Sequence, residues 1–304
     1  MILNLLDKHL NFLRSASGLF AIAGLFFVSG FCSVEAQPSK DNDSRYQLID
    51  RDEGERRLAA FRRQRLRGDY CFNFQLEHLP RREKTVRYNG TMWGTWNEQG
   101  ALTRFQISKT ALGSSETSPD LFLEVIIQNG ANPSVWKRRT SDENFERISG
   151  DQLFEPLISG IVYSPFDLQM PFIFWDEFEY EGPVRVKSRI VQRFLMLAPD
   201  DPIYESRGID AVRLSLDDTY DALFVVEVVG EEGKELSRFD VENFKKVQGQ
   251  YIVKSITLKD HVSKDRTRFI VKEASVGLDL DPLIFDPVRP LDTSLTPALE
   301  FEPL

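Results

Sequence analysis

The chain has 304 residues and a formal net charge of −9 at neutral pH, with two cysteines. So acidic a chain is a poor binder of nucleic acid, which excludes that class of function. The length allows one large domain or two small ones.

The N-terminal region carries an apolar run, Leu19–Phe31, that is too short to span a bilayer. Basic residues precede it, and Val34–Ala36 forms a cleavage site with small or compact residues. Residues 1–36 are therefore predicted to be a secretory signal, so that the mature chain begins at Gln37 and is exported to the periplasm. A short membrane anchor and a lipoprotein signal that uses Cys32 are the alternatives.

After the signal, residues 37–48 are polar and predict a flexible lead. The stretch 49–67 predicts a helix, because Leu58 and Phe61 fall on one side of a helical turn and Gly68 follows as a stop. This helix is rich in arginine. Its charged face is either solvated or meets an acidic partner or lipid headgroups.

Strand patterns then dominate, with apolar side chains at every second position. Five strands are predicted in the first half, at residues 70–78, 85–96, 101–109, 120–128 and 134–139. Six more are predicted at 183–197, 209–217, 220–229, 234–247, 250–260 and 266–275. Short turn-forming links join most of them, so the fold class is α+β, with one antiparallel sheet of about eleven strands that is strongly curled or closed. Within the second strand, Asn89-Gly90 is either a turn or a bulge.

The segment 150–181 separates the two sets of strands and is rich in large apolar side chains and prolines. Pro156 is typical of the start of a short helix over 151–164, and Ser164-Pro165 of the start of a second helix that breaks near Pro171. Two short helices cannot bury their apolar faces on each other, so the segment is expected to cover the curled sheet as a helical lid. Lid and sheet form either a packed core or a hydrophobic cavity.

Catalytic and metal-binding signatures are not evident. His78 and His261 have no metal-ligand spacing, and Cys71 has no histidine nearby in the sequence. There is no phosphate-binding loop and no nucleophile elbow. The sequence predicts no enzyme, no metal site and no cofactor. The exported chain would keep Cys71 alone, so it would depend on its core for stability, without a disulfide within the chain.

The second half contains the stretches "YDALFVVEVVGEEGKELSRFDVENFKKVQGQYIVKSITLKD" and "RTRFIVKEASVGLDLDPLIFDP". With the layout of strands, apolar insertion and strands, they make residues 49–287 similar to the bacterial outer-membrane lipoprotein-sorting carriers, the LolA/LolB-like family. The resemblance implies an unclosed β-barrel of eleven strands with helices over its mouth. Residues 288–304 are an added proline-rich tail. The arginine that latches the lid in this family is not placed, since Arg87, Arg104 and others are candidates.

The resemblance implies a periplasmic carrier that encloses the acyl chains of lipids or lipidated proteins. Transport partners at the inner or outer membrane are expected, with no transmembrane span in the mature chain. The alternative is a periplasmic sensory or scaffold protein that binds a partner protein through the same fold. The expected ligand-binding residues on the sheet are Phe72, Phe74, Leu76, Phe224, Val226 and Phe269, and those on the lid are Leu168, Met170, Phe172, Ile173, Phe174 and Trp175.

Overall fold

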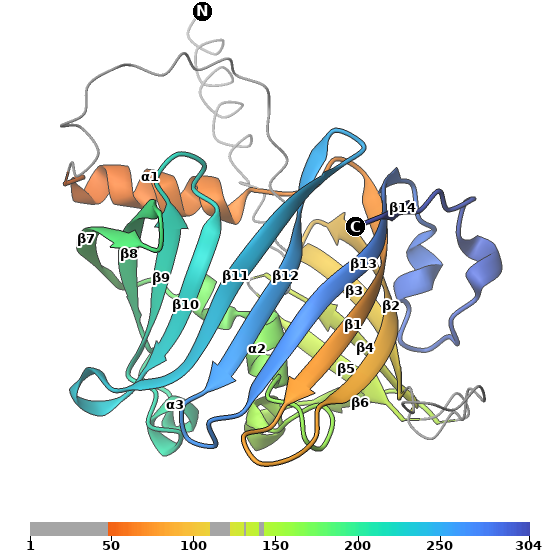
Figure 1. Ribbon diagram of the computed structural model, residues 1–304, viewed down its shortest axis with the longest axis horizontal. Coiled ribbons are helices and arrows are strands. Elements are labelled where there is room, and N and C mark those ends of the chain that lie inside the picture. The colour runs from red at the N-terminus through yellow and green to blue at the C-terminus, as the bar shows by residue number, and fades with distance from the viewer. Residues whose placement is uncertain (1–47, 110–121, 131, 140–142) are drawn as a thin grey trace, which may run out of the picture.

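The computed structural model describes residues 48–109, 122–130, 132–139 and 143–304. They form a curled antiparallel sheet with few helices (Figure 1). The predicted signal at 1–36 and nearly all of the predicted lead lie outside the described residues. None of the described helices is both long enough and apolar enough to cross a membrane.

Fourteen strands are found in the described part of the chain. The first six are β1 (Asp69–Leu79), β2 (Val86–Asn97), β3 (Gly100–Lys109), β4 (Phe122–Gln128), β5 (Ser134–Arg138) and β6 (Glu146–Ile148). The others are β7 (Phe178–Val186), β8 (Arg189–Leu197), β9 (Ala211–Asp217), β10 (Leu223–Val229), β11 (Glu235–Val247), β12 (Gln250–Asp260), β13 (Arg266–Leu278) and β14 (Glu302–Pro303). Their spatial order is β6-β5-β4-β3-β2-β1-β13-β12-β11-β10-β9-β8-β7, with β14 beside β13. Two meanders thus meet at the β1–β13 pair, and the order ends at β6 and β7.

The curled antiparallel sheet was predicted, but the count of about eleven strands is wrong. Residues 183–197 hold the end of β7 and the whole of β8 rather than one strand, because Lys187 takes a left-handed conformation (φ 57°) and turns the chain with Ser188. This pair lacks the Asn-Gly or Asp-Gly signature that marks most two-residue hairpins. The strands β6 and β14 have only three and two residues, which is too short for a recognisable alternation.

Asn89-Gly90 is neither a turn nor a bulge, since β2 pairs with β1 through both residues without a shift in register. A Cβ atom at Gly90 would lie 2.4 Å from Cζ of Phe74. The glycine is therefore needed to leave room for the Phe74 ring on the neighbouring strand.

The helix α1 (Arg51–Arg62) runs across one end of the sheet near β9 and β10 (Figure 1). Asp50 caps it by accepting a backbone N–H. The predicted helix over 49–67 is too long at its C-terminal end. There the amide of Gln250 binds both backbone groups of Arg67, accepting its N–H at 2.8 Å and donating to its carbonyl at 3.1 Å. These bonds fix the non-helical chain just before β1, where Gly68 has φ 72°.

The C-terminal segment lies on the convex face of the sheet (Figure 1). Ile284 and Phe285, in the 3-10 helix η5 (Pro282–Phe285), pack with Cys71 in a second apolar cluster. Arg104, fully buried on β3, pairs with Glu124 at 2.6 Å and donates to the Ile284 carbonyl at 2.6 Å. The predicted tail, 288–304, also lies on the body, since Leu291, Leu295, Leu299 and Phe301 pack against this cluster.

The remaining short helices lie in connections. They are α3 (Pro202–Ser206), η4 (Glu231–Gly233) and η6 (Thr293–Leu295).

Candidate functional site: the lid and the concave face

The apolar segment joins β6 to β7 and so connects the two ends of the strand order. It contains the 3-10 helix η2 (Gly150–Phe154), the helix α2 (Pro165–Gln169) and the 3-10 helix η3 (Pro171–Phe174). Figure 1 shows α2 in the hollow of the curled sheet. The segment therefore fills the concavity, where a lid was expected, and ends before 181 because β7 begins at Phe178.

The start of α2 follows from its sequence. Ser164 accepts the N–H of Asp167, and the Asp167 carboxylate accepts the N–H and the hydroxyl of Ser164 at 2.8 and 2.6 Å. No helix spans 151–164: beyond η2 the chain is irregular, because Pro156 cannot supply the N–H that would continue the turn.

Side chains from the body of the protein bind the backbone of the lid, among them Arg62, Asn129 and Thr267. Arg62 on α1 donates to the Ile173 carbonyl at 2.8 Å, and Asn129 after β4 donates to the Gln169 carbonyl at 2.7 Å. The hydroxyl of Thr267 on β13 accepts the N–H of Val162 at 3.0 Å. The Asn129 bond satisfies a carbonyl left without a partner at the end of α2. The two arginines suspected from the sequence lie elsewhere: Arg104 holds the C-terminal segment, and Arg87 pairs with Glu77.

The lid carries two unusual features. Met170, which joins α2 to η3, has φ 47° although it is not a glycine, so the joint is conformationally strained. Burial raises the pKa of Asp167 to about 6, in spite of the hydrogen bonds from Ser164 that lower it. The ionised form of Asp167 is therefore disfavoured in the closed lid.

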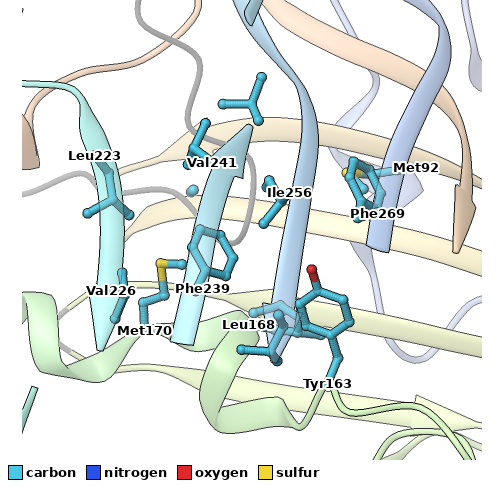
Figure 2. Packing of buried hydrophobic residues seen from close by; sticks show 14 of the residues in the cluster. Met92, Tyr163, Leu168, Met170, Leu223, Val226, Phe239, Val241, Ile256 and Phe269 are labelled. Atoms are coloured by element: carbon cyan, nitrogen blue, oxygen red, sulfur yellow. The ribbon is translucent and has the colours of Figure 1, made fainter. Parts of the chain in front are cut away.

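Two small cavities lie between the lid and the sheet. The larger has a volume of about 30 Å³ and is lined by Phe74, Leu76, Met92, Phe105, Ile107, Leu157, Ile161, Tyr163, Leu168 and Phe269. The smaller, of about 10 Å³, is lined by Asp167, Met170, Phe172, Val226, Val228, Ser237, Phe239 and Leu258. Figure 2 shows how the side chains of the lid and the sheet face one another across this region. The mostly apolar lining is suited to hydrocarbon, but both cavities are far smaller than the pockets of about 300–1,000 Å³ that hold drug-sized ligands.

Seven of the twelve residues expected to bind ligand line these cavities. They are Phe74, Leu76, Leu168, Met170, Phe172, Val226 and Phe269. Phe72 is fully buried in the same concave core and stacks on Tyr70 with 4.6 Å between ring centroids. Ile173 and Trp175 are buried in this core, and Phe174 packs against it partly exposed.

Phe224 does not lie with the others. It packs with Val191 and Val225 in a separate cluster, and the side chains of Lys187 and Arg189 lie over its ring. The ladder between β9 and β10 shifts register between Leu223 and Val225, so a bulge breaks the alternation that was assumed. The placement of Phe224 on the concave face is therefore wrong.

Several residues of the site were missed by the sequence analysis. Phe105 and Ile107 on β3 follow the same alternation as Phe74 and Leu76, so that pattern was available to find them. Arg62, Asn129 and Thr267 carried no signal, because a side chain that binds a distant backbone carbonyl or N–H leaves no periodic pattern.

The residues weighed for catalysis have structural roles. His78 is buried with Nδ1 at 3.1 Å from the Thr267 hydroxyl, and His261 pairs with Glu235. Burial raises the pKa of the Cys71 thiol to about 12, so it is protonated and unreactive. The described residues contain no group of ligands placed to hold a metal ion.

No protein-family model matches the chain, and no curated protein matches its sequence. Solved structures do match. A DUF1329 family protein from Desulfovibrio piger has a TM-score of 0.63 at 11% identity, over 81% of this chain and 98% of that one. An outer membrane lipoprotein-sorting protein domain from Vibrio parahaemolyticus has a TM-score of 0.62 at 14% identity, over 77% and 95%.

A LolA superfamily protein from Nitrosomonas europaea has a TM-score of 0.54 at 14% identity, over 76% of this chain and 96% of that one. At such low identities these likenesses show the fold. The resemblance drawn from the sequence is confirmed at that level: this chain has the LolA-like fold of the lipoprotein-sorting domains.

Proposed function

We propose that the protein binds acyl chains of lipids or lipidated proteins between the concave face and the lid, and carries them through the periplasm. The proposal rests on the two small cavities between the lid and the sheet, which are lined mostly by apolar side chains from both. Burying one methylene stabilises a complex by about 0.8 kcal/mol, so such walls suit an acyl chain that must leave a membrane.

Loading requires the lid to move, because the closed cavities are too small for an acyl chain. The lid is suited to this movement, since its helices have only five and four residues. Its polar ties are few: Arg62 and Asn129 each donate to two carbonyls of the lid, Thr267 accepts one N–H, and each such hydrogen bond contributes about 1 kcal/mol. Local opening would therefore leave the ladders of the sheet intact.

A photoactivatable acyl chain tests the proposal. The full exported chain is mixed with a palmitoyl probe that carries a diazirine, illuminated, and digested for mass spectrometry. We expect labels on Leu168, Met170 and Phe269, which line the cavities, and none on Phe224, which lies in the separate cluster. If Phe224 were labelled more than Val226, the acyl chain would bind on the convex face of the sheet, and the proposal would be wrong.

The alternative function, a sensory or scaffold protein, predicts a different result. Native mass spectrometry of the protein purified from its own cell envelope would then show a stable protein complex without lipid. The carrier proposal expects a bound lipid or acylated peptide instead, and no catalytic turnover of it.

A further inference from the structure

Tyr163 places a polar group inside the larger cavity. Only 2% of its surface is exposed, and no described residue forms a hydrogen bond with its hydroxyl. Figure 2 shows the oxygen pointing from the lid toward the interior of the sheet. A buried hydroxyl without a partner costs free energy, and phenylalanine would fill the same space without that cost.

The surroundings restrict what this hydroxyl can bind. The other side chains that line the cavity are apolar, and no cation is among them. Burial, together with the carboxylates of Asp167 and Glu242, raises the pKa of Tyr163 well above its ordinary value. The phenol therefore keeps its proton and acts as a donor, and the apolar lining without a cation disfavours an anionic acceptor such as the carboxylate of a free fatty acid.

We propose that Tyr163 donates a hydrogen bond to an uncharged acyl carbonyl, so that the ligand is an acyl ester or acyl amide rather than a fatty acid or a plain hydrocarbon. This inference rests on the proposed function and names the ligand class of that site. The lid itself carries the donor, so the bond would form with the lid closed over the chain and would help to hold it there.

Matched probes test the inference in the full chain. Displacement of N-phenyl-1-naphthylamine is measured with 1-palmitoylglycerol, N-palmitoylethanolamine, palmitate and 1-hexadecylglycerol, an ether that lacks the carbonyl. The wild type should prefer the ester or the amide over the ether by about fivefold, the factor that corresponds to a net hydrogen bond of about 1 kcal/mol. The ester and amide arms distinguish a lipid source from an N-acylated protein source.

Tyr163→Phe should bind all the uncharged compounds equally and melt at the same or a higher temperature. Tyr88→Phe, which removes the hydroxyl of a buried tyrosine outside the cavity lining, should keep the wild-type preference. Equal binding of ester and ether by the wild type overturns the inference and leaves the carrier proposal standing. A lower melting temperature for Tyr163→Phe also overturns it, because the hydroxyl then serves an internal partner. Failure of every acyl compound to bind sinks both.

Discussion

Because Asp167 is buried in the lid, its ionisation should make the stability of the protein depend on pH. Its pKa is about 6 in the closed lid, against an ordinary value of 3.8 expected for the unfolded chain. Below about pH 4 the carboxyl is protonated in both states and costs nothing. As the pH rises toward 6 the unfolded chain gains more from ionisation, so the contribution to stability falls and stays low above pH 6.

Asp167→Asn should remove this dependence. We expect the variant to be more stable than the wild type at pH 7.5, by on the order of 1 kcal/mol, and equal to it near pH 4. Urea unfolding of both proteins at each pH value measures the difference in the free energy of unfolding. Asp260→Asn is the control, because the Asp260 charge also raises the pKa of Asp167. A difference that is the same at both pH values would contradict the prediction.

Arg62 is the side chain on α1 that holds the lid backbone. Arg62→Met keeps an unbranched stem but loses the donors to the Ile173 and Trp175 carbonyls. We expect the uptake of a fluorescent acyl probe to become about fivefold faster, as the loss of about 1 kcal/mol predicts. Arg63→Met, at the exposed neighbouring position, should leave the rate unchanged in the same stopped-flow experiment. Equal rates for all three proteins would rule out a latch at Arg62.

At the scale of elements, a charge buried in the lid should cost less stability than a charge buried in a strand. Phe172 is 2% exposed and meets the rings of Phe166 and Trp175 edge-on. Its helix η3 has four residues and borders the strained joint at Met170. A charge placed there can reach water by local opening of the lid.

Phe172→Asp should therefore weaken binding of the acyl probe more than it lowers the melting temperature. Phe72→Asp provides the comparison, because Phe72 is fully buried in the middle of β1 and its replacement should unfold the protein, at a cost of several kcal/mol. Probe titration and thermal unfolding are measured on both variants. Global unfolding of Phe172→Asp, or undiminished binding, would show that the lid is ordinary core.

The elements could be predicted where alternation or capping signals are regular. The alternation in β1 and the Ser164-Pro165 start of α2 were readable, and so was the broad layout of sheet and lid. The hairpin at Lys187 was not, because its turn lacks glycine or asparagine, and the bulge at Phe224 was not, because register depends on the neighbouring strand. Binding of a backbone by Arg62 or Asn129 depends on tertiary proximity, which no local pattern encodes.

At the scale of the whole molecule, the C-terminal segment covers a second apolar cluster on the convex face. Arg104, Glu124 and Arg138 form a buried ion-pair triad beneath it, and Arg104 also donates to the Ile284 carbonyl. Removing Arg104 would leave Glu124 paired with Arg138, but the Ile284 and Arg289 carbonyls would lose their donor, and a hydrogen bond from a charged group typically contributes about 1.5–3 kcal/mol. The triad thus links the attachment of this segment to the stability of the sheet.

Arg104→Met should destabilise the protein by about 2 kcal/mol and loosen the segment, because the Ile284 carbonyl loses its charged donor. Cys71, buried at the base of the cluster, should then react faster with a thiol reagent in native buffer, since its burial is what keeps the thiol protonated. The measurement uses the chain that begins at Gln37, in which Cys71 is the single thiol to be followed. Arg87→Met, on the neighbouring strand β2, should leave the labelling rate unchanged. If the stability fell without faster labelling of Cys71, the triad would stabilise the sheet but would not hold the C-terminal segment in place.

The two ends of the strand order, β6 and β7, are joined by the lid rather than by a ladder of hydrogen bonds. A fully closed ring of strands has a fixed girth, because widening it would break ladders. In this sheet the circumference can change. Neighbouring strands tolerate twists from about 10 to 35°, so a small change of twist at each ladder adds up to a large change in the curvature of the sheet. If the protein carries acyl chains as proposed, the length of the segment that joins β6 to β7 would then set how far the sheet can open around them.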